Sequence, residues 1–242
     1  MIQVDQINKY IKKNQILNSV SATIHKGDSI GIIGPNGAGK STFLKILASI
    51  LKPDRGKIYY QGASYKEKLK ELRSNIGYIP QDIALYEDLT VQDQILFWQK
   101  ASKQKVAKEY VNKVMSALDL FGVQDKKVKA LSGGWKRKVN VSIGLLHNPE
   151  LILLDEPTAG VDLAAKEDLI QWLKLLQQGG KTLVMVSHDW DILNRICEKI
   201  MIFQKGKLIF FDAFSKLEEF ELNNFGNETD KDLGKLLKLR MR

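Results

Sequence analysis

Short apolar runs alternate with longer segments of helical periodicity over most of the chain. Each run is a continuous block of strand length, which is typical of a strand buried on both faces of a sheet. The runs lie at residues 74–80, 151–154, 182–186 and 199–203, and another at 29–33. Because helical segments separate them, the pattern predicts an α/β fold with a mostly parallel core sheet covered on both faces.

Two regions depart from this alternation. Residues 2–24 alternate apolar and polar positions and break at Asn14 and Asn18, which predicts an N-terminal antiparallel β subdomain. Residues 87–130 show a helical pattern that opens with Thr90-Val91-Gln92-Asp93, a capping box. The second region therefore predicts a small α-helical subdomain.

The length bounds the domain organisation. A chain of 242 residues has room for one full α/β core with a smaller lobe. We expect one domain over residues 1–212, with the helical subdomain inserted at about 87–146. Residues 213–242 are expected to form a short, basic, helical C-terminal tail.

The loop after the first buried run fits the phosphate-binding pattern G-x-x-x-x-G-K-[ST], and a helix is predicted after it over residues 40–51. Its glycines let backbone N–H groups converge on a compact anion without a side chain in the way. Lys40 is expected to contact the β- and γ-phosphates of ATP, and Ser41 to ligate Mg²⁺. This is the loop of a P-loop NTPase. The predicted nucleotide-binding residues are Gly34, Pro35, Asn36, Gly37, Ala38, Gly39, Lys40, Ser41 and Thr42.

A carboxylate pair follows the buried run at 151–154. Asp155 and Glu156 stand at the carboxyl end of a predicted strand, where open α/β sheets bind ligands. Asp155 is suited to hold Mg²⁺, and Glu156 to accept a proton from, or orient, the water that attacks the γ-phosphate. The alternative is that both acids only cap a helix beyond Pro157. The phosphate loop in the same chain favours the catalytic interpretation.

The tetrapeptide Leu131-Ser132-Gly133-Gly134 stands upstream of the acidic strand. With the phosphate loop and the acidic pair, it makes the chain resemble the nucleotide-binding subunit of an ABC transporter, from Tyr10 to about Asp212. The resemblance implies a head-to-tail dimer in which Ser132, Gly133 and Gly134 grip the ATP held by the opposite subunit. The simpler alternative is a serine N-cap followed by flexible glycines.

The resemblance implies further site residues. Gln81 resembles the glutamine that touches Mg²⁺ or the attacking water and relays contact with the membrane partner. His188 resembles the switch histidine on the γ-phosphate, Asp162 the loop that couples the two ATP sites, and Tyr10 the tyrosine that stacks on adenine. Each also has an ordinary interpretation: an exposed loop amide, a polar surface histidine, a helix N-cap and an edge-strand tyrosine, respectively.

Trp135 departs from the family pattern, which commonly has glutamine there, and a basic run at 136–138 follows it. The departure leaves open whether the subunit pairs with itself or with a non-identical partner. Variation at this position followed by basic residues, and the segment at 85–90, resemble ATPase subunits of bacterial exporters.

Charge and cysteine content bear on partners and location. Lys and Arg number 37 against 28 Asp and Glu, a net charge of +9, with clusters at 103–108, 126–129 and 235–242. An anionic membrane surface explains this excess, and we do not expect nucleic acid as a partner. Residues 231–242 could form an amphipathic helix that touches lipid or the membrane subunit, or one that closes the domain's own surface. Cys197 is the single cysteine and is expected to pack in the core.

We therefore expect a cytoplasmic ATPase, peripheral on the cytoplasmic face of the cell membrane, that drives a separate integral membrane permease, with export as the favoured direction. No run reaches the roughly 20 apolar residues that span a bilayer, and residues 1–5 lack signal-peptide organisation. One alternative is a soluble ABC-type ATPase in nucleic-acid or cofactor-assembly work. Another is a nucleoside-phosphate kinase, which leaves residues 132–134 unexplained.

Overall fold

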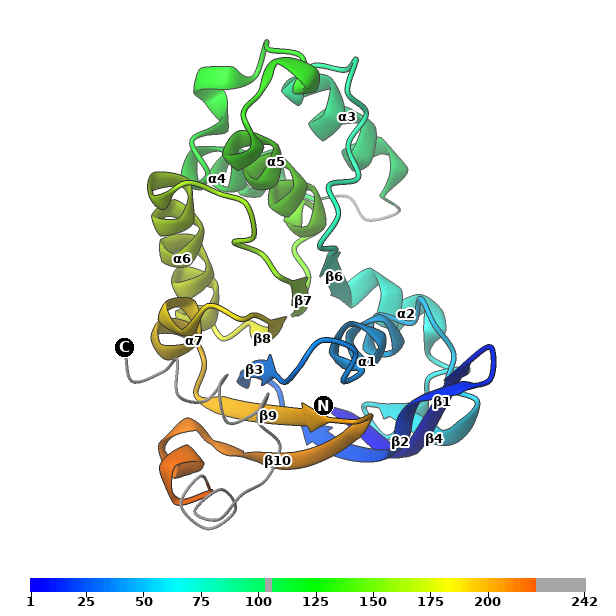
Figure 1. Ribbon diagram of the computed structural model, residues 1–242. Helices are drawn as coiled ribbons and strands as arrows, with labels where there is room; N and C mark the ends of the chain where they lie inside the picture. The colour runs from blue at the N-terminus through cyan, green and yellow to red at the C-terminus, as the bar shows by residue number, and fades with distance from the viewer. Residues whose placement is uncertain (103–105, 221–242) are drawn as a thin grey trace.

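The computed structural model describes residues 1–102 and 106–220. A six-stranded sheet in the order β10-β9-β3-β8-β7-β6 forms its centre (Figure 1). Five strands are parallel, and β10 pairs antiparallel with β9. The strands are β3 (Ser29–Ile33), β6 (Ile76–Ile79), β7 (Leu151–Asp155), β8 (Thr182–Val186), β9 (Lys199–Gln204) and β10 (Lys207–Ala213). The predicted mostly parallel α/β fold is confirmed.

Alternate residues of the central strands pack into different hydrophobic clusters. Ile152 and Leu154 of β7 share a cluster with α6 (Leu163–Gln178) and α7 (Trp190–Ile196). Leu151 and Leu153 belong to a second cluster that contains α1 (Lys40–Leu47). Since neighbouring side chains of a strand point to opposite faces, helices cover both faces of this sheet, as Figure 1 shows. Every residue of β7 is buried, which explains its continuous apolar run.

The second sheet is antiparallel, as predicted for the N-terminal region. Its order is β2-β1-β4-β5. The strands are β1 (Ile2–Ile11), β2 (Asn14–Ile24), β4 (Arg55–Tyr60) and β5 (Ala63–Ser64), and a short helix α2 (Leu69–Asn75) follows them. Phe43 of α1 meets Phe203 of β9 at 5.1 Å between ring centroids, so α1 packs directly on the central sheet.

Helix α1 ends earlier than the predicted residue 51. Its last helical residue is Leu47, because Ser49 adopts a left-handed backbone with φ of 57°. The amides of Ile50 and Leu51 then turn back to the carbonyl of Lys45, at 2.9 and 3.1 Å. This turn closes the helix without a glycine.

The helical pattern at 87–130 corresponds to several short elements in the upper part of Figure 1. They are α3 (Val91–Ala101), α4 (Lys108–Ala117) and two short 3₁₀ helices, η1 (Leu120–Val123) and η2 (Val128–Ala130). Helix α5 (Gly133–Leu145) follows this range. The predicted N-cap is present, since the hydroxyl of Thr90 accepts a hydrogen bond from the Asp93 amide at 3.0 Å. The bounds 87–146 stay our proposal for this subdomain.

The last described element is η3 (Phe214–Lys216). The predicted amphipathic tail at 231–242 and part of the basic cluster at 103–108 lie outside the described residues. Within the described ranges, no helix combines the length and the apolar character that crossing a bilayer needs. Cys197 is buried just after α7, as expected, and burial raises the pKa of its thiol.

Candidate nucleotide site

Strand register sets the position of the site. Asp155 at the end of β7 pairs with Val186 at the end of β8, and Ile32 of β3 pairs with the same Val186. The segments that leave these three strands therefore start at one edge of the sheet. They are the phosphate loop, the residue Glu156, and the loop with His188.

The backbone of the phosphate loop requires glycine where the chain packs most tightly. Gly34 has φ of 149°, and a Cβ there would lie 2.1 Å from the carbonyl oxygen of Phe203. Gly39 has φ of 100° and precedes the first turn of α1, with the side chain of Leu17 only 2.7 Å from an added Cβ. Larger residues at either position would displace the loop from β2 and β9.

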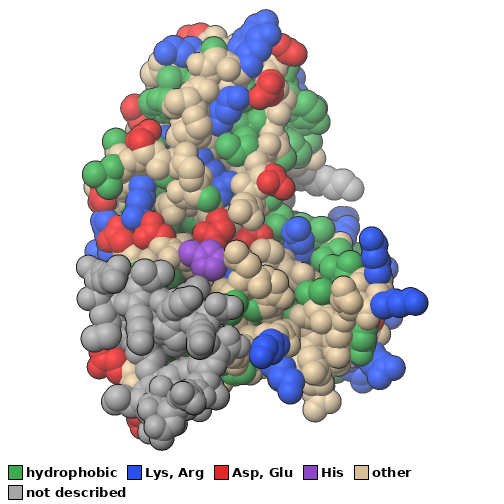
Figure 2. Space-filling model, in the orientation of Figure 1, with side chains coloured by type: hydrophobic (Ala, Val, Ile, Leu, Met, Phe, Trp, Pro, Cys, Tyr) green, Lys and Arg blue, Asp and Glu red, His purple; other side chains and the backbone are tan. Residues whose placement is uncertain are grey.

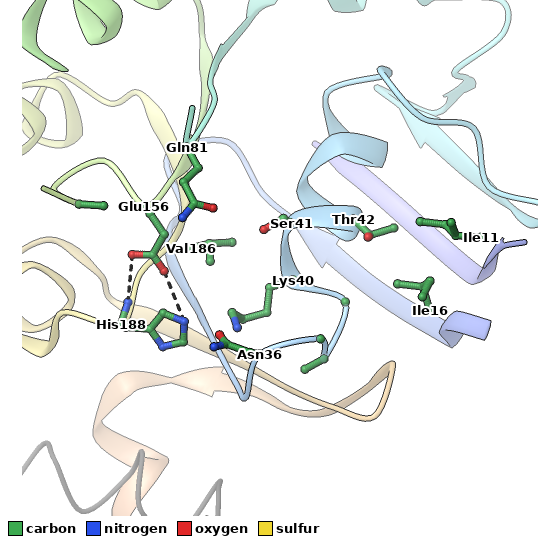
Figure 3. A pocket seen from close by; sticks show the side chains of 14 residues that line it. Ile11, Ile16, Asn36, Lys40, Ser41, Thr42, Gln81, Glu156, Val186 and His188 are labelled. Atoms are coloured by element: carbon green, nitrogen blue, oxygen red, sulfur yellow. Dashed lines mark hydrogen bonds and ion pairs between the residues drawn. The ribbon is translucent and has the colours of Figure 1, made fainter. Parts of the chain in front are cut away.

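A pocket of about 600 Å³ opens at this edge (Figure 3). That volume lies in the range of small-molecule sites. Its lining joins the phosphate loop to segments far away in the sequence. The lining residues are Ile11, Ile16, Asn36, Gly37, Ala38, Gly39, Lys40, Ser41, Thr42, Gln81, Glu156, Ala159, Val186 and His188. Ten of the predicted site residues are thus brought together around one cavity.

Lys40 is a buried cation in this pocket. Its ammonium donates hydrogen bonds to the carbonyl oxygens of Gly34, at 2.7 Å, and Pro35, at 3.0 Å. Burial lowers the pKa of Lys40, while the charges of Glu156 and Asp155 oppose that shift. Gly34 and Pro35 do not line the pocket, but their carbonyl oxygens fix the position of the ammonium. The ammonium can exchange these neutral carbonyls for phosphate oxygens, which form stronger, charge-assisted bonds.

Ser41 and Asp155 form the second group. The hydroxyl of Ser41 donates to Oδ1 of Asp155 at 3.0 Å. Asp155 is 2% exposed, and burial raises its pKa, with the Ser41 hydrogen bond acting the other way. The described residues contain no cluster of three or more His, Cys, Asp or Glu that could cage a metal. A hydroxyl beside one carboxylate instead fits Mg²⁺, which takes few protein ligands together with substrate phosphates and water.

Glu156 and His188 form the third group. The backbone N–H of His188 donates to Oε2 of Glu156 at 3.4 Å, and Nε2 of the ring lies 3.5 Å from Oε1 (Figure 3). Burial raises the pKa of Glu156, while burial and then the charge of Lys40 lower the pKa of His188. Oε1 of Glu156 is buried and accepts no hydrogen bond from any described residue. It is an acceptor suited to a water molecule in the pocket.

The corner formed by Ser132, Gly133 and Gly134 lies outside this pocket. Ser132 caps α5, its hydroxyl accepting from the amide of Trp135 at 3.5 Å. Ser132 and Gly133 are exposed, whereas Gly134 is buried against Asp162, whose Oδ2 would lie 3.0 Å from an added Cβ. The structure therefore joins the Ser132 corner to the Asp162 loop, away from the nucleotide pocket of the same chain.

Asp162 itself is the N-cap of α6, because its Oδ1 accepts from the amide of Ala165 at 2.9 Å. The capping alternatives for Ser132 and Asp162 are thus both present in the structure. A cap uses one acceptor of each side chain, and both residues are exposed, so capping leaves each free to contact a second molecule.

Tyr10 does not line the pocket. Its amide donates to Asp54 at 2.6 Å, and the residue is 39% exposed. Ile11 and Ile16 of the β1–β2 hairpin line the cavity instead. Neither isoleucine is among the pocket residues predicted from the sequence. Their place in a predicted hairpin that leads into the phosphate loop could have indicated this role.

Trp135 also lies outside the pocket. It is partly buried against the larger hydrophobic cluster, and the ammonium of Lys138 lies 4.5 Å from the centroid of its ring. The tryptophan therefore packs the start of α5 onto the helical region.

Comparison with known proteins places this geometry in a family. A family model described as ABC transporter matches residues 17–159. The linearmycin resistance ATP-binding protein LnrL of Bacillus subtilis is 33% identical over 211 residues, 86% of this chain and 68% of that protein. Two relatives differ in transport direction. The probable sulfate/thiosulfate import ATP-binding protein CysA of Chlorella vulgaris is 31% identical over 227 residues (93% of this chain, 96% of CysA). Nod factor export ATP-binding protein I of Burkholderia lata is 30% identical over 223 residues (91% and 73%).

A solved structure agrees with these matches. A dimeric bacterial ABC transporter cassette superposes with a TM-score of 0.78 at 28% identity, over 88% of this chain and 98% of that chain. The same cassette in a post-hydrolysis state, bound to ADP and Pi, gives a TM-score of 0.76 at 27% identity, with the same coverage. With the family model matching more than half of its length, this chain belongs to the ABC transporter family.

Proposed function

We propose that this chain is the ATP-binding and ATP-hydrolysing subunit of an ABC exporter, working as a dimer on a separate membrane subunit. Family membership supports ATP binding and hydrolysis. The observation that carries the proposal is the convergence, on one pocket, of the Lys40 ammonium, the Ser41–Asp155 pair and the Glu156–His188 pair. These are a phosphate-binding cation, a set of magnesium ligands and a base.

Each group has one task in hydrolysis. The loop amides and Lys40 hold the β- and γ-phosphates, and Ser41, Asp155 and Gln81 supply oxygen ligands for Mg²⁺. Mg²⁺, when bound, neutralises charge on the phosphate oxygens. Glu156 accepts a proton from the attacking water at Oε1, to which no described residue donates a hydrogen bond, and its raised pKa strengthens it as a base. His188 orients Glu156 and reaches toward the γ-phosphate.

The exposed Ser132 corner supports a dimer. Ser132 caps α5 and Gly133 begins it, both are exposed, and a helix N-terminus favours an anion because its first N–H groups have no partner within the helix. Their own pocket is elsewhere, so we assign this corner to ATP held by a second subunit, identical or related. Leu163, next to Asp162, is 81% exposed, and an apolar side chain so exposed is readily buried in such an interface. The dimeric cassette similar to this chain supports the same assembly.

A membrane subunit is supported by apolar surface near Gln81. Tyr86 and Phe97 meet edge to face at 5.3 Å between ring centroids, yet both are exposed, as are Ile83 and Leu96. Figure 2 shows hydrophobic side chains at the surface of the upper part of the molecule, where α3 lies. An exposed apolar patch beside a catalytic loop fits a protein partner, and the net charge of +9 fits the cytoplasmic face of an anionic membrane.

Export rests on the resemblance at 85–90 and on the basic residues that follow Trp135. Relatives of both directions share about the same identity with this chain. Purification of the chain with its membrane subunit, followed by transport assays in inside-out vesicles, would decide: ATP-driven uptake into such vesicles supports export, and ATP-driven loss overturns it.

The dimer and the base are tested together with Glu156→Gln. Removing the base should slow ATP turnover by roughly 10²–10⁴-fold while the phosphate contacts remain, so the variant should form a dimer in MgATP. Size-exclusion chromatography and light scattering measure this. Glu150→Gln, on the surface beside Lys181, is the matched control and should turn over ATP like the unsubstituted chain. A Glu156→Gln variant that binds ATP but stays monomeric contradicts the proposed dimer.

A further inference from the structure

Arg137 carries a buried charge that neither the motifs nor the proposed reaction uses. The residue is 1% exposed. No carboxylate among the described residues forms an ion pair with it; instead its N–H groups donate only to backbone carbonyl oxygens. Nε donates to Pro157 at 2.9 Å, Nη1 to Pro80 at 2.9 Å and to Gln81 at 2.7 Å, and Nη2 to Asp155 at 3.0 Å and also to Glu156.

These acceptors belong to two segments that both line or support the nucleotide pocket. One follows β6 and contains Gln81, and the other consists of Asp155 at the end of β7 and the residues directly after it, Glu156 and Pro157. Arg137 lies on α5, which begins just after Ser132. The guanidinium therefore joins three parts of the proposed site through one rigid group.

A second residue of α5 supports this connection. Asn140, three positions after Arg137 and so on the same helix face, accepts from the amide of Ala84 at 3.4 Å. Asn140 is also buried. Helix α5 thus holds the Gln81 segment at two points, its carbonyls through Arg137 and an amide through Asn140.

We infer that Arg137 is a positioning residue for ATP hydrolysis: it fixes the backbone of Gln81 and Glu156 relative to each other and to the Ser132 end of α5. The inference deepens the proposed function and rests on the roles given there to Gln81, Glu156 and Ser132. The guanidinium suits this role because its five donors lie in a fixed planar fork. Lysine could hold the charge but could not reach all of these carbonyls at once.

The contacts of Arg137 also connect the Ser132 end of α5 to the side-chain direction of Glu156. Glu156 has a left-handed backbone with φ of 50°, so its side chain leaves the chain at an angle that the carbonyl contacts of Arg137 help to fix. When the partner subunit's ATP binds at Ser132, any movement of α5 reaches Gln81 and Glu156 through this guanidinium. Arg137 thereby connects a phosphate contact in one site to the water-activating groups of the other site.

The test compares substitutions of two adjacent buried cations in the full chain. Arg137→Met removes every carbonyl contact, and Arg137→Lys keeps the charge with fewer donors. Lys138→Met removes an equal charge from the same helix; Lys138 is 4% exposed but pairs with Asp168, away from the carbonyls. ATP turnover, affinity for a non-hydrolysable ATP analogue and thermal unfolding are measured for all three variants. A fourth variant, Arg137→Ala, leaves space for added guanidinium ion and is assayed for turnover with and without it.

We expect Arg137→Met to lower kcat by roughly 10–10³-fold, because a misplacement of about 1 Å can cost 10²-fold. Its affinity for the analogue should change by less than about threefold, since no phosphate contact is lost. Arg137→Lys should lie between, and Lys138→Met should keep the kcat of the unsubstituted chain. Guanidinium ion at millimolar concentration should restore part of the activity of Arg137→Ala, a readout that general destabilisation would not give.

The possible results distinguish the positioning role of Arg137 from the proposed ATPase function. Should Arg137→Met fail to fold, Arg137→Lys decides, because it keeps the charge. A folded Arg137→Met or Arg137→Lys with the kcat of the unsubstituted chain overturns the inference and leaves the ATPase proposal standing. Equal losses in Arg137→Met and Lys138→Met also overturn it. An unsubstituted chain that does not hydrolyse ATP overturns the proposed function itself, and the inference with it.

Discussion

The hydroxyl of Ser41 donates to Oδ1 of Asp155 across 3.0 Å, although the two residues are 114 positions apart in the chain. The contact exists because β3 and β7 both pair with β8 in parallel register, so the segments that follow them start at the same edge of the sheet. Two ordinary side chains become one oxygen-rich site through the topology of the sheet.

This pair predicts the metal dependence. Asp155→Asn keeps the shape of the side chain but removes its charge, so half-maximal ATP hydrolysis should require roughly 10–100-fold more Mg²⁺, since carboxylate oxygens are preferred ligands of this ion. A magnesium titration of turnover at saturating ATP measures the shift. Ser41→Thr is the matched control, because it keeps the hydroxyl. Superimposable magnesium curves for Asp155→Asn and the unsubstituted chain would remove Asp155 from the metal site.

The buried ammonium of Lys40 predicts opposite effects on affinity and stability. Lys40→Met removes a charge-assisted contact with phosphate, so ATP affinity should fall by at least about tenfold. Its burial lowers the pKa of Lys40 and disfavours the charged form, so the nucleotide-free variant should unfold at the same or a higher temperature. Calorimetric titration and thermal unfolding measure the two effects.

Lys52→Met, at an exposed position beyond α1, is the control for the loss of one positive charge. It should bind ATP like the unsubstituted chain. If Lys40→Met binds ATP with unchanged affinity, the ammonium does not contact phosphate and its role in the pocket has to be revised.

Much of the fold follows from the sequence because local chemistry and tertiary packing agree there. Strands β3, β7 and β8 are apolar at all but one terminal position each, and all of their residues are buried. The end of α1 could not be predicted, because Ser49 adopts a left-handed backbone, which serine rarely does. The residue types of the strands specify their burial, whereas the packing of neighbouring elements determines where α1 ends.

The site divides in the same way. The phosphate loop and the acidic pair lie on the pocket because their motifs specify backbone geometry. The position of Tyr10 relative to the pocket is harder to predict. The β1–β2 register shifts between Lys9 and Tyr10, and such a shift changes the side of the sheet to which a side chain points. Arg137 stands in the basic run at 136–138, and nothing in the sequence of that run shows that its guanidinium is buried against backbone carbonyls.

The two glycines after Ser132 predict separable effects. A Cβ at Gly134 would lie 3.0 Å from Oδ2 of Asp162 and 3.1 Å from Cβ of Ala165, so Gly134→Ala should disturb the contact between α5 and α6 and lower the unfolding temperature. At Gly133 the nearest atom, the carbonyl oxygen of Gly160, would be 3.4 Å away. Gly133→Ala should therefore fold normally.

In the proposed dimer, however, Gly133 faces the partner's phosphate, so its methyl group should weaken ATP-driven dimerisation of the Glu156→Gln background. Light scattering in MgATP measures the dimer fraction. Gly122→Ala, where nothing lies within 4 Å of the new Cβ, is the control for adding a methyl group. Full dimerisation of Gly133→Ala would mean that no phosphate approaches this corner closely.

His147 predicts how stability depends on pH. Its Nε2 lies 2.9 Å from the carbonyl oxygen of Ile76, and burial lowers its pKa, with that hydrogen bond opposing the shift. Below about pH 6.5 the unfolded chain therefore binds a proton that the folded chain does not. The contribution of His147 to the free energy of unfolding is therefore fully present above that pH. It is lost as the pH falls toward the lowered pKa, with a slope of at most about 1.4 kcal/mol per pH unit.

His147→Gln keeps an amide donor for Ile76 but cannot titrate. Urea unfolding at about pH 8 and pH 5.5, on either side of the ordinary histidine pKa, should show the free energy of unfolding falling more steeply in the unsubstituted chain than in the variant. The carboxylates titrate alike in both proteins, so the difference between the two slopes isolates His147. Parallel slopes would show that His147 is protonated equally in the folded and unfolded chains, and that the contact with Ile76 stabilises the imidazolium enough to offset burial.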